Sequence, residues 1–333
     1  MNLDALKTAP RLLIETTLQP IAGTRFQPTG FPDLGPATYQ SADNVPMLLV
    51  ESAQSMANHF ESVCWDHAND DLHEDLRGLP YVRSTLPDGV KTNSILEAHR
   101  INSPYIVNSD AFGQIETKIG YKKNQPFHPA DKLAKALLHY DPCSLIHGIF
   151  LEKVGGVVRL PRVLTGFIEA SEAKLASSGG VKVDRVQPET TGKSTPYGKA
   201  DDGYGNVPYA RDNEFTGNIT AYFILDLAQL RGFGFGDDEF EVLVTLSLWK
   251  VRRFLETGLR LRTACDLELT NDPVVTRPKD STWRLPSTEE LTTNLKRLIP
   301  TLKTRLGPSP LDVTYSSNVA KARSKKSDET PAA

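Results

Sequence analysis

The sequence predicts an α+β protein whose core is a ferredoxin-like sheet with long insertions between its elements. Periodic segments follow one another in the order strand, helix, strand, strand, helix, strand, which is the order of that fold. Residues 176–215 are rich in Gly, Pro, Ser, Thr and charged residues, and so long a loop in a compact domain is usually functional or disordered. Residues 307–333 end with almost no large apolar side chains, so we expect a disordered tail there.

The first half of the chain supplies one strand and two helices. Arg11–Leu18 alternates apolar and polar residues, as a half-buried strand does. A Gly- and Pro-rich loop follows over residues 20–45. We expect a helix over 44–65, because a proline stands near its start and apolar residues then recur at helical spacing. Further along, 93–107 should be extended, and Pro129–Tyr140 should form a short helix.

The second half supplies the remaining strands and one long helix. Arg162–Ala170 and Thr216–Leu227 are strand-like. Asp237–Glu256 is apolar on most sides, so we expect a largely buried helix. Leu259–Leu269 alternates, with its apolar residues on one side, which predicts a strand that leaves a basic face open.

The small net charge of −3 hides a marked separation of charge along the chain. Residues 1–90 carry 5 Lys and Arg against 12 Asp and Glu, whereas residues 91–193 carry 14 against 10. A dense basic patch then begins after Trp249. Such a patch attracts a polyanion, but it is also typical of the solvated face of an ordinary helix and strand. Its cations are Lys250, Arg252, Arg253, Arg260 and Arg262.

Two further polar features suit contact with a nucleic acid. Arg25 and Phe26 follow Gly23 in the first long loop, and a cation beside an aromatic ring can hold a phosphate while a base stacks. The expected helix over 44–65 carries an uncharged polar stripe that suits hydrogen bonds to sugar or phosphate. An ordinary surface loop and a solvated helix face that binds no ligand would have the same sequence pattern. The stripe consists of Gln54, Ser55 and Asn58.

Several classes of site receive no support. The Gly-rich run 232–236 fails the spacing of a dinucleotide fingerprint, and the acidic Asp237–Glu239 that follows would repel a pyrophosphate. We expect a flexible turn and a helix cap there. All histidines lie between His59 and His147, but none has the spacing of a zinc site, so we expect no metal and no cofactor. No nucleophile motif is recognisable, and the sequence indicates no active site.

Cysteine usage and hydropathy favour a cytoplasmic protein. The three cysteines are odd in number and far apart, which argues against a disulfide framework and for a reducing compartment. The N-terminus shows no signal-peptide pattern. No stretch approaches the roughly 20 apolar residues that a membrane span needs. We therefore expect a soluble, cytoplasmic protein with no membrane partner.

Three segments resemble a known family. They read LLIETTLQPIAGTRFQPTGFPDLGPATY near the N-terminus, MLLVESAQSMANHFE at Met47–Glu61, and later TGNITAYFILDL. Together they are similar to the backbone subunit of the type I-G (formerly I-U) CRISPR Cascade complex, a member of the repeat-associated RAMP superfamily. The resemblance runs from about residue 11 to 270, and S-A-Q-S-M-A-N is its most specific part.

The resemblance implies a modified RNA-recognition fold, described as a hand with palm, fingers and thumb. The palm would be a single domain over 1–306, with a finger-like insertion at about 109–160, a thumb at about 171–215 and the tail 307–333. Copies would polymerise along the guide RNA (crRNA) beside other Cascade subunits, and the guide would pair with the target DNA strand while the protein holds its backbone. In this antiviral ribonucleoprotein the subunit is not an enzyme, because a separate helicase-nuclease cuts.

The resemblance also implies where RNA is contacted. The loop after the first strand is a usual RNA-contacting place in the superfamily, the polar helix stripe would face the guide, and thumb cations could reach a phosphate backbone. A basic residue is expected after S-x-A-N, and His59 departs from that pattern. Combined with the basic patch, the expected RNA-binding residues are Arg25, Phe26, Ser52, Gln54, Ser55, Asn58, Lys193, Lys199, Arg211, Lys250, Arg252, Arg253, Arg260 and Arg262.

Two other functions stay open from the sequence. Relatives in type III complexes use a loop aspartate and a divalent metal to cleave target RNA, and Asp33, Asp70 and Asp71 stand in candidate loops here. The alternative is thus a metal-dependent endoribonuclease of the RAMP type. A third reading is a protein-interaction scaffold without nucleic acid.

For the filament, we expect the acidic residues 1–90 to meet the basic middle of the next copy in a head-to-tail contact.

Overall fold

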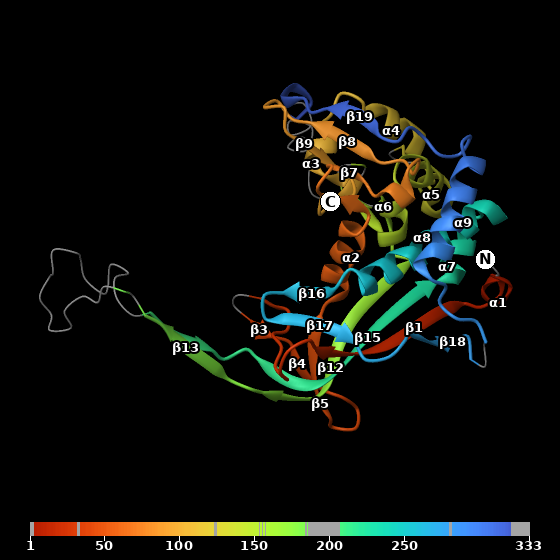
Figure 1. Cartoon of the computed structure of the whole chain (residues 1–333). Coiled ribbons are helices and arrows are strands. Elements are labelled where there is room, and N and C mark those ends of the chain that lie inside the picture. Colours follow the sequence, from red (N-terminus) through yellow and green to blue (C-terminus); the bar gives the residue numbers. More distant parts are fainter. Residues whose placement is uncertain are drawn as a thin grey trace, which may run out of the picture.

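An antiparallel sheet packed against helices forms the centre of the protein (Figure 1). The computed structural model describes residues 3–31, 34–122, 125–152, 154, 156, 158–183, 185, 207–279 and 282–320. Within these residues the predicted α+β class is confirmed. No helix of the described part combines the length and the hydrophobicity that crossing a membrane requires.

The main sheet has the strand order β16-β17-β1-β15-β12-β5-β4, and β18 also pairs with β1. Each neighbouring pair runs antiparallel. Along the chain, α2 lies between β1 and β12, and α8 lies between β15 and β17, so the predicted order of elements is present. The strands are β1 Arg11–Pro20, β4 Thr38–Gln40, β5 Pro46–Glu51, β12 Leu164–Leu175, β15 Phe215–Asp226, β16 Leu259–Arg262, β17 Cys265–Leu269 and β18 Val274–Arg277.

Two helices cover one face of this sheet. Helix α2 (Ala53–Ser62) contacts β12, and α8 (Asp237–Glu256) contacts β15 and α2. A cluster of aromatic rings joins the layers: Phe60 of α2 lies 6.0 Å from Phe223 of β15 and 5.7 Å from Phe254 of α8. All three rings are buried, which places the core between the sheet and these helices.

Gly166 in β12 lets α2 approach the sheet closely. A Cβ atom at this position would lie 2.8 Å from Cζ of Phe60, inside van der Waals contact. Gly166→Ala should therefore lower the free energy of unfolding by about 1–3 kcal/mol through overpacking. Urea denaturation of the variant measures this, with Gly113→Ala as the control, because nothing lies within 4 Å of a Cβ there. Equal stability of the two variants would contradict the packing described.

A second layer of helices and short strands stands above the sheet in Figure 1. Its three-stranded sheet has the order β19-β8-β9, with β19 parallel to β8. Helix α9 packs along α8. The elements of this part are β6 Trp65–Asp66, β7 Asp71–Leu72, η1 Glu74–Leu76, β8 Val82–Thr85, β9 Lys91–Asn93, η2 Arg100–Asn102, α3 Pro104–Val107, α4 Phe112–Ile119, α5 Pro129–Tyr140, α6 Pro142–His147, β10 Ile149–Leu151, β11 Val158–Leu160, α9 Thr288–Thr301 and β19 Leu311–Thr314.

A two-stranded hairpin projects from the end of the main sheet (Figure 1). It consists of β13 (Ser178–Lys182) and β14 (Val207–Arg211). The pairing of β12 with β15 shifts register between Ser171 and Lys174, and such a bulge bends the strands. The remaining short elements are α1 Asp4–Lys7, β2 Gly30–Phe31, β3 Gly35–Pro36 and α7 Leu227–Gly232.

The predicted helix over 44–65 is wrong in its first part. Residues Pro46–Glu51 form β5, and α2 begins only at Ala53. Leu48 and Val50 point into the core, so the apolar run fits an alternating strand as well as it fits a helix, and pairing with β12 decides. Ser52 then caps α2, its Oγ accepting a hydrogen bond from the Ser55 amide at 3.2 Å.

Three other expectations also need correction. The segment 93–107 is not extended, because η2 and α3 occupy about half of it. Residues 259–269 form a hairpin of β16 and β17, with Arg262 opposite Cys265, instead of one strand. Residues 307–320 are folded, since β19 pairs with β8; residues 321–333 lie outside the described part. The helices at 129–140 and 237–256 and the strands at 11–18 and 216–227 are confirmed, within a residue or two at their ends.

Candidate nucleic-acid interface

Helix α2 presents a polar face at the edge of the sheet. Met56 and Phe60 are fully buried, whereas Gln54 and Asn58 are exposed and Ser55 is half-buried. The N-cap hydroxyl of Ser52 is occupied by the Ser55 amide. The exposed stripe therefore has amide groups free to reach outward, and these are uncharged hydrogen-bonding groups of the kind that contact sugar and phosphate.

Arg262 fixes the loop before β5 to the β16–β17 hairpin. Its Nη1 donates to the carbonyl oxygens of Gln27 at 2.8 Å and Val50 at 3.3 Å. Its Nη2 pairs with the carboxylate of Glu51, which is fully buried. The backbone amide of Gln27 also donates to Ala264 at 2.7 Å. Arg262 is thus committed to a structural role at the start of α2, although it is 23% exposed.

His59 lies beside this ion pair and is not cationic at neutral pH. Its Nε2 is 3.9 Å from Oε1 of Glu51, and its ring lies 5.5 Å from that of Phe254. Burial lowers the pKa of His59, and the charge of Arg262 lowers it further against the opposing effect of Glu51. The resemblance predicts a basic residue at position 59, so His59 differs from that expectation in charge as well as in residue type.

The pKa of His59 makes stability depend on pH. A lowered pKa in the folded state means that the unfolded chain binds the proton more tightly. The stabilising contribution of neutral His59 is complete above the unfolded pKa of about 6.5 and is lost as the pH falls below it. Between pH 7.5 and 5.5, the wild type should lose more unfolding free energy in urea than His59→Gln. Parallel losses would contradict this assignment.

Arg25 and Arg211 share one carboxylate at the root of the projecting hairpin. Oε2 of Glu214 is 3.7 Å from Nε of Arg25, and Oε1 is 3.0 Å from Nη1 of Arg211. The Ser178 hydroxyl donates to the same carboxylate at 2.6 Å, and these hydrogen bonds from Ser178 and Arg211 lower the pKa of Glu214. Arg25 is 53% exposed, so its guanidinium is accessible at the hairpin root.

Phe26 does not have the role that the sequence suggested. The residue is 1% exposed, and its backbone forms a bridge with Phe215. Its ring is part of the core, so it cannot stack on a base in this arrangement. An exposed aromatic ring stands on the hairpin instead, because Tyr209 is 58% exposed and the guanidinium of Arg211 lies 5.4 Å from its centroid.

The basic patch is divided by the fold. Lys250 is completely buried, and Arg252 donates to the carbonyl oxygens of Leu285 and Pro286, both at 2.9 Å. Arg253 lies 3.3 Å from Nε2 of His73 on a different side of α8. Arg260 is exposed on β16. The interface that the geometry brings together excludes Lys250, Arg252 and Arg253; Lys193 and Lys199 lie outside the described residues.

The open face of the main sheet is not basic. Glu15 and Glu169 stand on it, together with the stacked rings of Phe167 and Tyr222, whose centroids are 5.1 Å apart. The hydroxyl of Tyr39 donates to Glu169 at 2.5 Å. The expected basic face is therefore wrong, because the β16–β17 turn redirects Arg262 into the structure. Cations gather at one end of the sheet instead.

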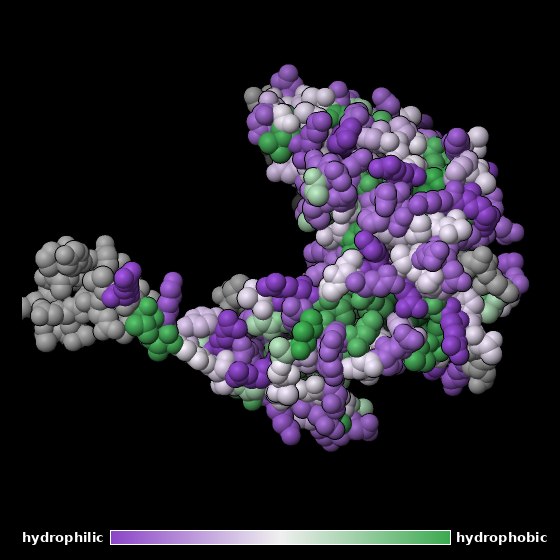
Figure 2. Space-filling model, viewed as in Figure 1, coloured by the Kyte–Doolittle hydropathy of each residue, from purple (hydrophilic) through white to green (hydrophobic). Residues whose placement is uncertain are grey.

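These contacts form one connected line from the hairpin to α2. Arg211, Glu214 and Arg25 lie at the hairpin root, Phe26 and Phe215 link the loop to β15, and Arg262 and Glu51 link that loop to α2. In Figure 2 the left outline of the molecule is hollowed between the part with β8 and β9 and the part with β16, and Figure 1 shows α2 at the back of this hollow. We define the interface as this hollow together with the hairpin root.

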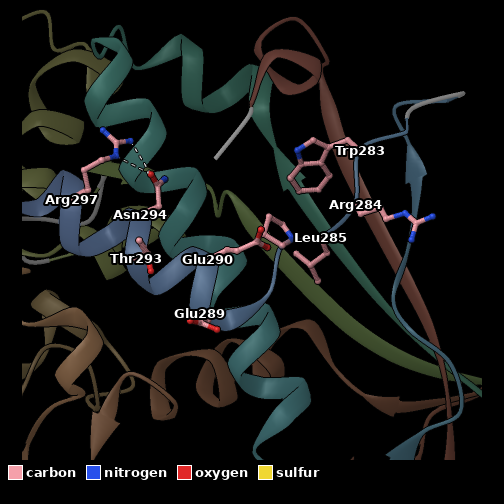
Figure 3. A pocket seen from close by; sticks show the side chains of 9 residues that line it. Trp283, Arg284, Leu285, Glu289, Glu290, Thr293, Asn294 and Arg297 are labelled. Carbon is pink, nitrogen blue, oxygen red and sulfur yellow. Dashed lines mark hydrogen bonds between the residues drawn. The ribbon is translucent and has the colours of Figure 1, made fainter.

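A groove formed by α9 and the segment before it is less suited to binding a ligand than the interface is. It has a volume of about 820 Å³ and is lined by residues of α9 and of the segment before it, including Arg284 and Arg297 (Figure 3). Arg297 is held by Glu241 at 2.7 Å and by Asn294, and Glu290 completes the capping box of α9 with Ser287. Arg297 and Glu290 are therefore already engaged in contacts that stabilise the fold.

The aspartates considered for catalysis are not assembled into a metal site. Asp70 accepts a hydrogen bond from Nε1 of Trp65 at 3.3 Å, and Asp71 accepts one from the hydroxyl of Tyr81 at 3.1 Å. Asp33 lies outside the described residues. Within the described part of the chain, no three His, Cys, Asp or Glu side chains are grouped as metal ligands.

A family model matches the segments that build much of this interface. Residues 12–175 match the family described as CRISPR-associated protein GSU0053. Over this range, just under half of the chain, the sequence is similar to that CRISPR-associated family. The matched range contains β1, the Arg25 loop, α2 and β12, whereas Arg211, Arg260 and Arg262 lie beyond it.

Three solved structures are similar to this chain at low sequence identity. A "CRISPR RNA-guided surveillance complex, pre-nicking" is 13% identical, with a TM-score of 0.38 over 96% of this chain and 100% of that chain. A "CRISPR RNA-guided surveillance complex" is 12% identical, with a TM-score of 0.35 over 88% and 84%. Csc2 of Thermofilum pendens is 13% identical, with a TM-score of 0.30 over 91% and 80%. TM-scores this low add no support to the assignment of the fold. No curated protein matches the chain.

Sequence reasoning missed the carboxylates that organise the interface. Glu51 and Glu214 are both buried; Glu51 orders one arginine and Glu214 orders two. A glutamate at the end of the apolar run MLLVE is a signal that a buried ion pair follows, because a charge there needs a partner. The partner itself, 211 residues away in sequence, could not have been found without the fold.

Proposed function

We propose that the protein is a non-catalytic, guide-RNA-binding backbone subunit of a CRISPR interference complex of the Cascade type, subtype I-G. In this proposal copies of the chain polymerise along the guide RNA beside other Cascade subunits. The protein holds the sugar–phosphate backbone and leaves the bases to pair with the target DNA strand. The family match supports a CRISPR role, and the finer assignment rests on the interface.

The observation that carries the proposal is the connected line of cations and polar groups at one end of the sheet. Arg25 and Arg211 supply positive charge where the hairpin leaves the sheet, Arg260 is exposed on β16, and α2 adds uncharged donors and acceptors. Phosphate contacts of this kind position a nucleic acid without reading its bases. The ring of Phe26, which belongs to this line, is buried and cannot stack on a base. Binding through the sugar–phosphate backbone does not require such stacking.

The parts of the hand follow in the same proposal. The palm is the unit of β1, α2, β12, β15, α8 and β17, whose sheet order β17-β1-β15-β12 supports a ferredoxin-like plan. The thumb at about 171–215 starts at the bulge in β12 and contains the projecting hairpin. The finger-like insertion at about 109–160 corresponds to α4, α5, α6 and β10.

Co-expression with a repeat array tests the proposal. The purified protein should carry RNA of uniform length, detected by ultraviolet absorbance and denaturing gels. Purification free of RNA would instead favour an interaction scaffold. Incubating the assembly with complementary RNA and Mg²⁺ should leave that RNA intact; cuts at regular intervals would contradict the non-catalytic assignment and favour an endoribonuclease.

A further inference from the structure

One face of the main sheet carries no helix of the described chain. In Figure 1, α2 and α8 lie on one side of the sheet, and no described helix lies across the other side. Gly166 and Phe223 face α2, since both approach Phe60. Side chains alternate along a strand, so Phe167 and Tyr222 point to the uncovered side. Figure 2 shows apolar surface over the region of β1, β12 and β15.

The strand register places an aromatic pair between two carboxylates on this open face. Tyr222 of β15 stands opposite Phe167 of β12 and opposite Glu15 of β1. The two rings are stacked, and their centroids are 5.1 Å apart. Glu169 follows Phe167 by two residues and therefore lies on the same side of β12. The rings thus have one carboxylate on β1 and another on β12.

Within the described chain, hydroxyl groups are the hydrogen-bond partners of both carboxylates. The hydroxyl of Thr276 donates to Glu15 at 2.7 Å, and the hydroxyl of Tyr39 donates to Glu169 at 2.5 Å. These donors are neutral, and a carboxylate can accept several hydrogen bonds. Both negative charges reach the rings, because burial and the charges of Glu15 and Glu169 raise the pKa of Tyr222.

Two carboxylates beside stacked rings fit a flat cation. A guanidinium stacks on an aromatic face and donates hydrogen bonds from its edge to carboxylates. An ammonium has no flat face to stack, and a phosphate is repelled by both charges. The open face therefore differs in kind from the hairpin root, where Arg25 and Arg211 supply positive charge.

We propose that this open face docks a basic segment of another protein chain, with an arginine that stacks on Tyr222 and donates hydrogen bonds to Glu15 and Glu169. Charge complementarity selects the occupant, because the face offers anions and aromatic rings that an arginine completes. Arginine and aromatic residues are enriched among the side chains that dominate protein–protein binding energy. The inference goes beyond guide-RNA binding and does not depend on it, since the two ligands occupy different surfaces.

Titration with an arginine peptide tests the proposal. The full chain is isotope-labelled in its Phe and Tyr rings, and NMR follows these rings while a peptide of alternating Gly and Arg is added. We expect saturable shifts of the Phe167 and Tyr222 resonances. The same peptide with citrulline in place of arginine keeps the shape without the charge and should leave both rings unshifted. Equal shifts with the two peptides, or none with the arginine peptide, would overturn the proposal.

Removal of the two charges separates docking from general attraction between peptide and protein. The double variant Glu15→Gln with Glu169→Gln keeps oxygen acceptors for the neighbouring hydroxyls and should weaken peptide binding about tenfold or more. Glu289→Gln removes an exposed carboxylate of α9 and should bind the peptide as the wild type does. An equal loss of affinity in the two proteins, or no loss in the double variant, contradicts docking at this face.

Two further measurements decide between this occupant and others. Guide RNA added in place of the peptide should leave both rings unshifted, and shifts caused by RNA would overturn the proposal by assigning the face to nucleic acid. Sedimentation should be the same for the wild type and the double variant. Loss of self-association in the variant would instead assign the face to a second copy. Absence of RNA binding altogether would contradict the guide-RNA function alone.

Discussion

Arg262→Met should destabilise the protein by about 3–5 kcal/mol, because it leaves the carboxylate of Glu51 buried without a partner. Glu51 is fully inaccessible, and its Oε1 already lacks a hydrogen-bond partner in the structure. Arg262 also holds the carbonyl oxygens of Gln27 and Val50, so its loss loosens the loop before β5 as well. Urea denaturation followed by circular dichroism measures the change.

Two further variants distinguish the ion pair from general damage to the hairpin. Arg260→Met removes a neighbouring but exposed guanidinium and should change the unfolding free energy by no more than about 0.5 kcal/mol. Replacing both partners, Glu51→Met with Arg262→Met, should recover part of the loss, because no charge is then left buried. If Arg262→Met were no worse than Arg260→Met, the buried pair would not have the role described.

Arg25→Ala and Arg260→Ala should each weaken guide-RNA binding about tenfold, since a hydrogen bond to a charged group contributes about 1.5 kcal/mol or more. Both side chains are exposed, Arg25 at the hairpin root and Arg260 on β16. The loss should be the same for RNAs of unrelated sequence, because these cations meet phosphates. Fluorescence anisotropy with labelled RNAs of equal length gives the affinities.

Arg284→Ala is the matched control for these variants. Arg284 is also exposed, but it lines the groove beside α9 in Figure 3, away from the interface. Its affinity for RNA should equal that of the wild type. If all three variants lost affinity alike, binding would follow total charge, and no particular surface could be assigned.

The sequence predicts most of the sheet and the long helix, because those segments have one strong periodicity. β1 alternates along its whole length, and α8 is apolar on most sides. The apolar run before Ser52 satisfies a strand and a helix equally, and only its pairing with β12 decides between them. The single strand expected at 259–269 fails for a different reason, since a turn inside an alternating segment leaves the pattern intact.

The sequence predicts a residue of the site only where the solvent exposure of its side chain follows from the local sequence pattern. Arg25, Gln54 and Asn58 are accessible as expected from a loop and a helix face. Lys250 stands in a sequence as basic as that of Arg260, yet it points into the core and contacts Cys143, which is 107 residues away in sequence. No one-dimensional pattern of charge distinguishes the two, because burial of a lysine depends on partners that only the tertiary structure brings together.

The salt dependence of RNA binding tests the central claim most directly, namely that cations of this chain hold a sugar–phosphate strand without reading its bases. Affinities of the wild type for several RNAs of equal length and unrelated sequence are measured over a range of salt concentrations. The account predicts coinciding lines, with log affinity falling linearly with log salt by about 0.7 for each phosphate neutralised. Affinities that differ strongly between sequences and hardly change with salt would contradict it.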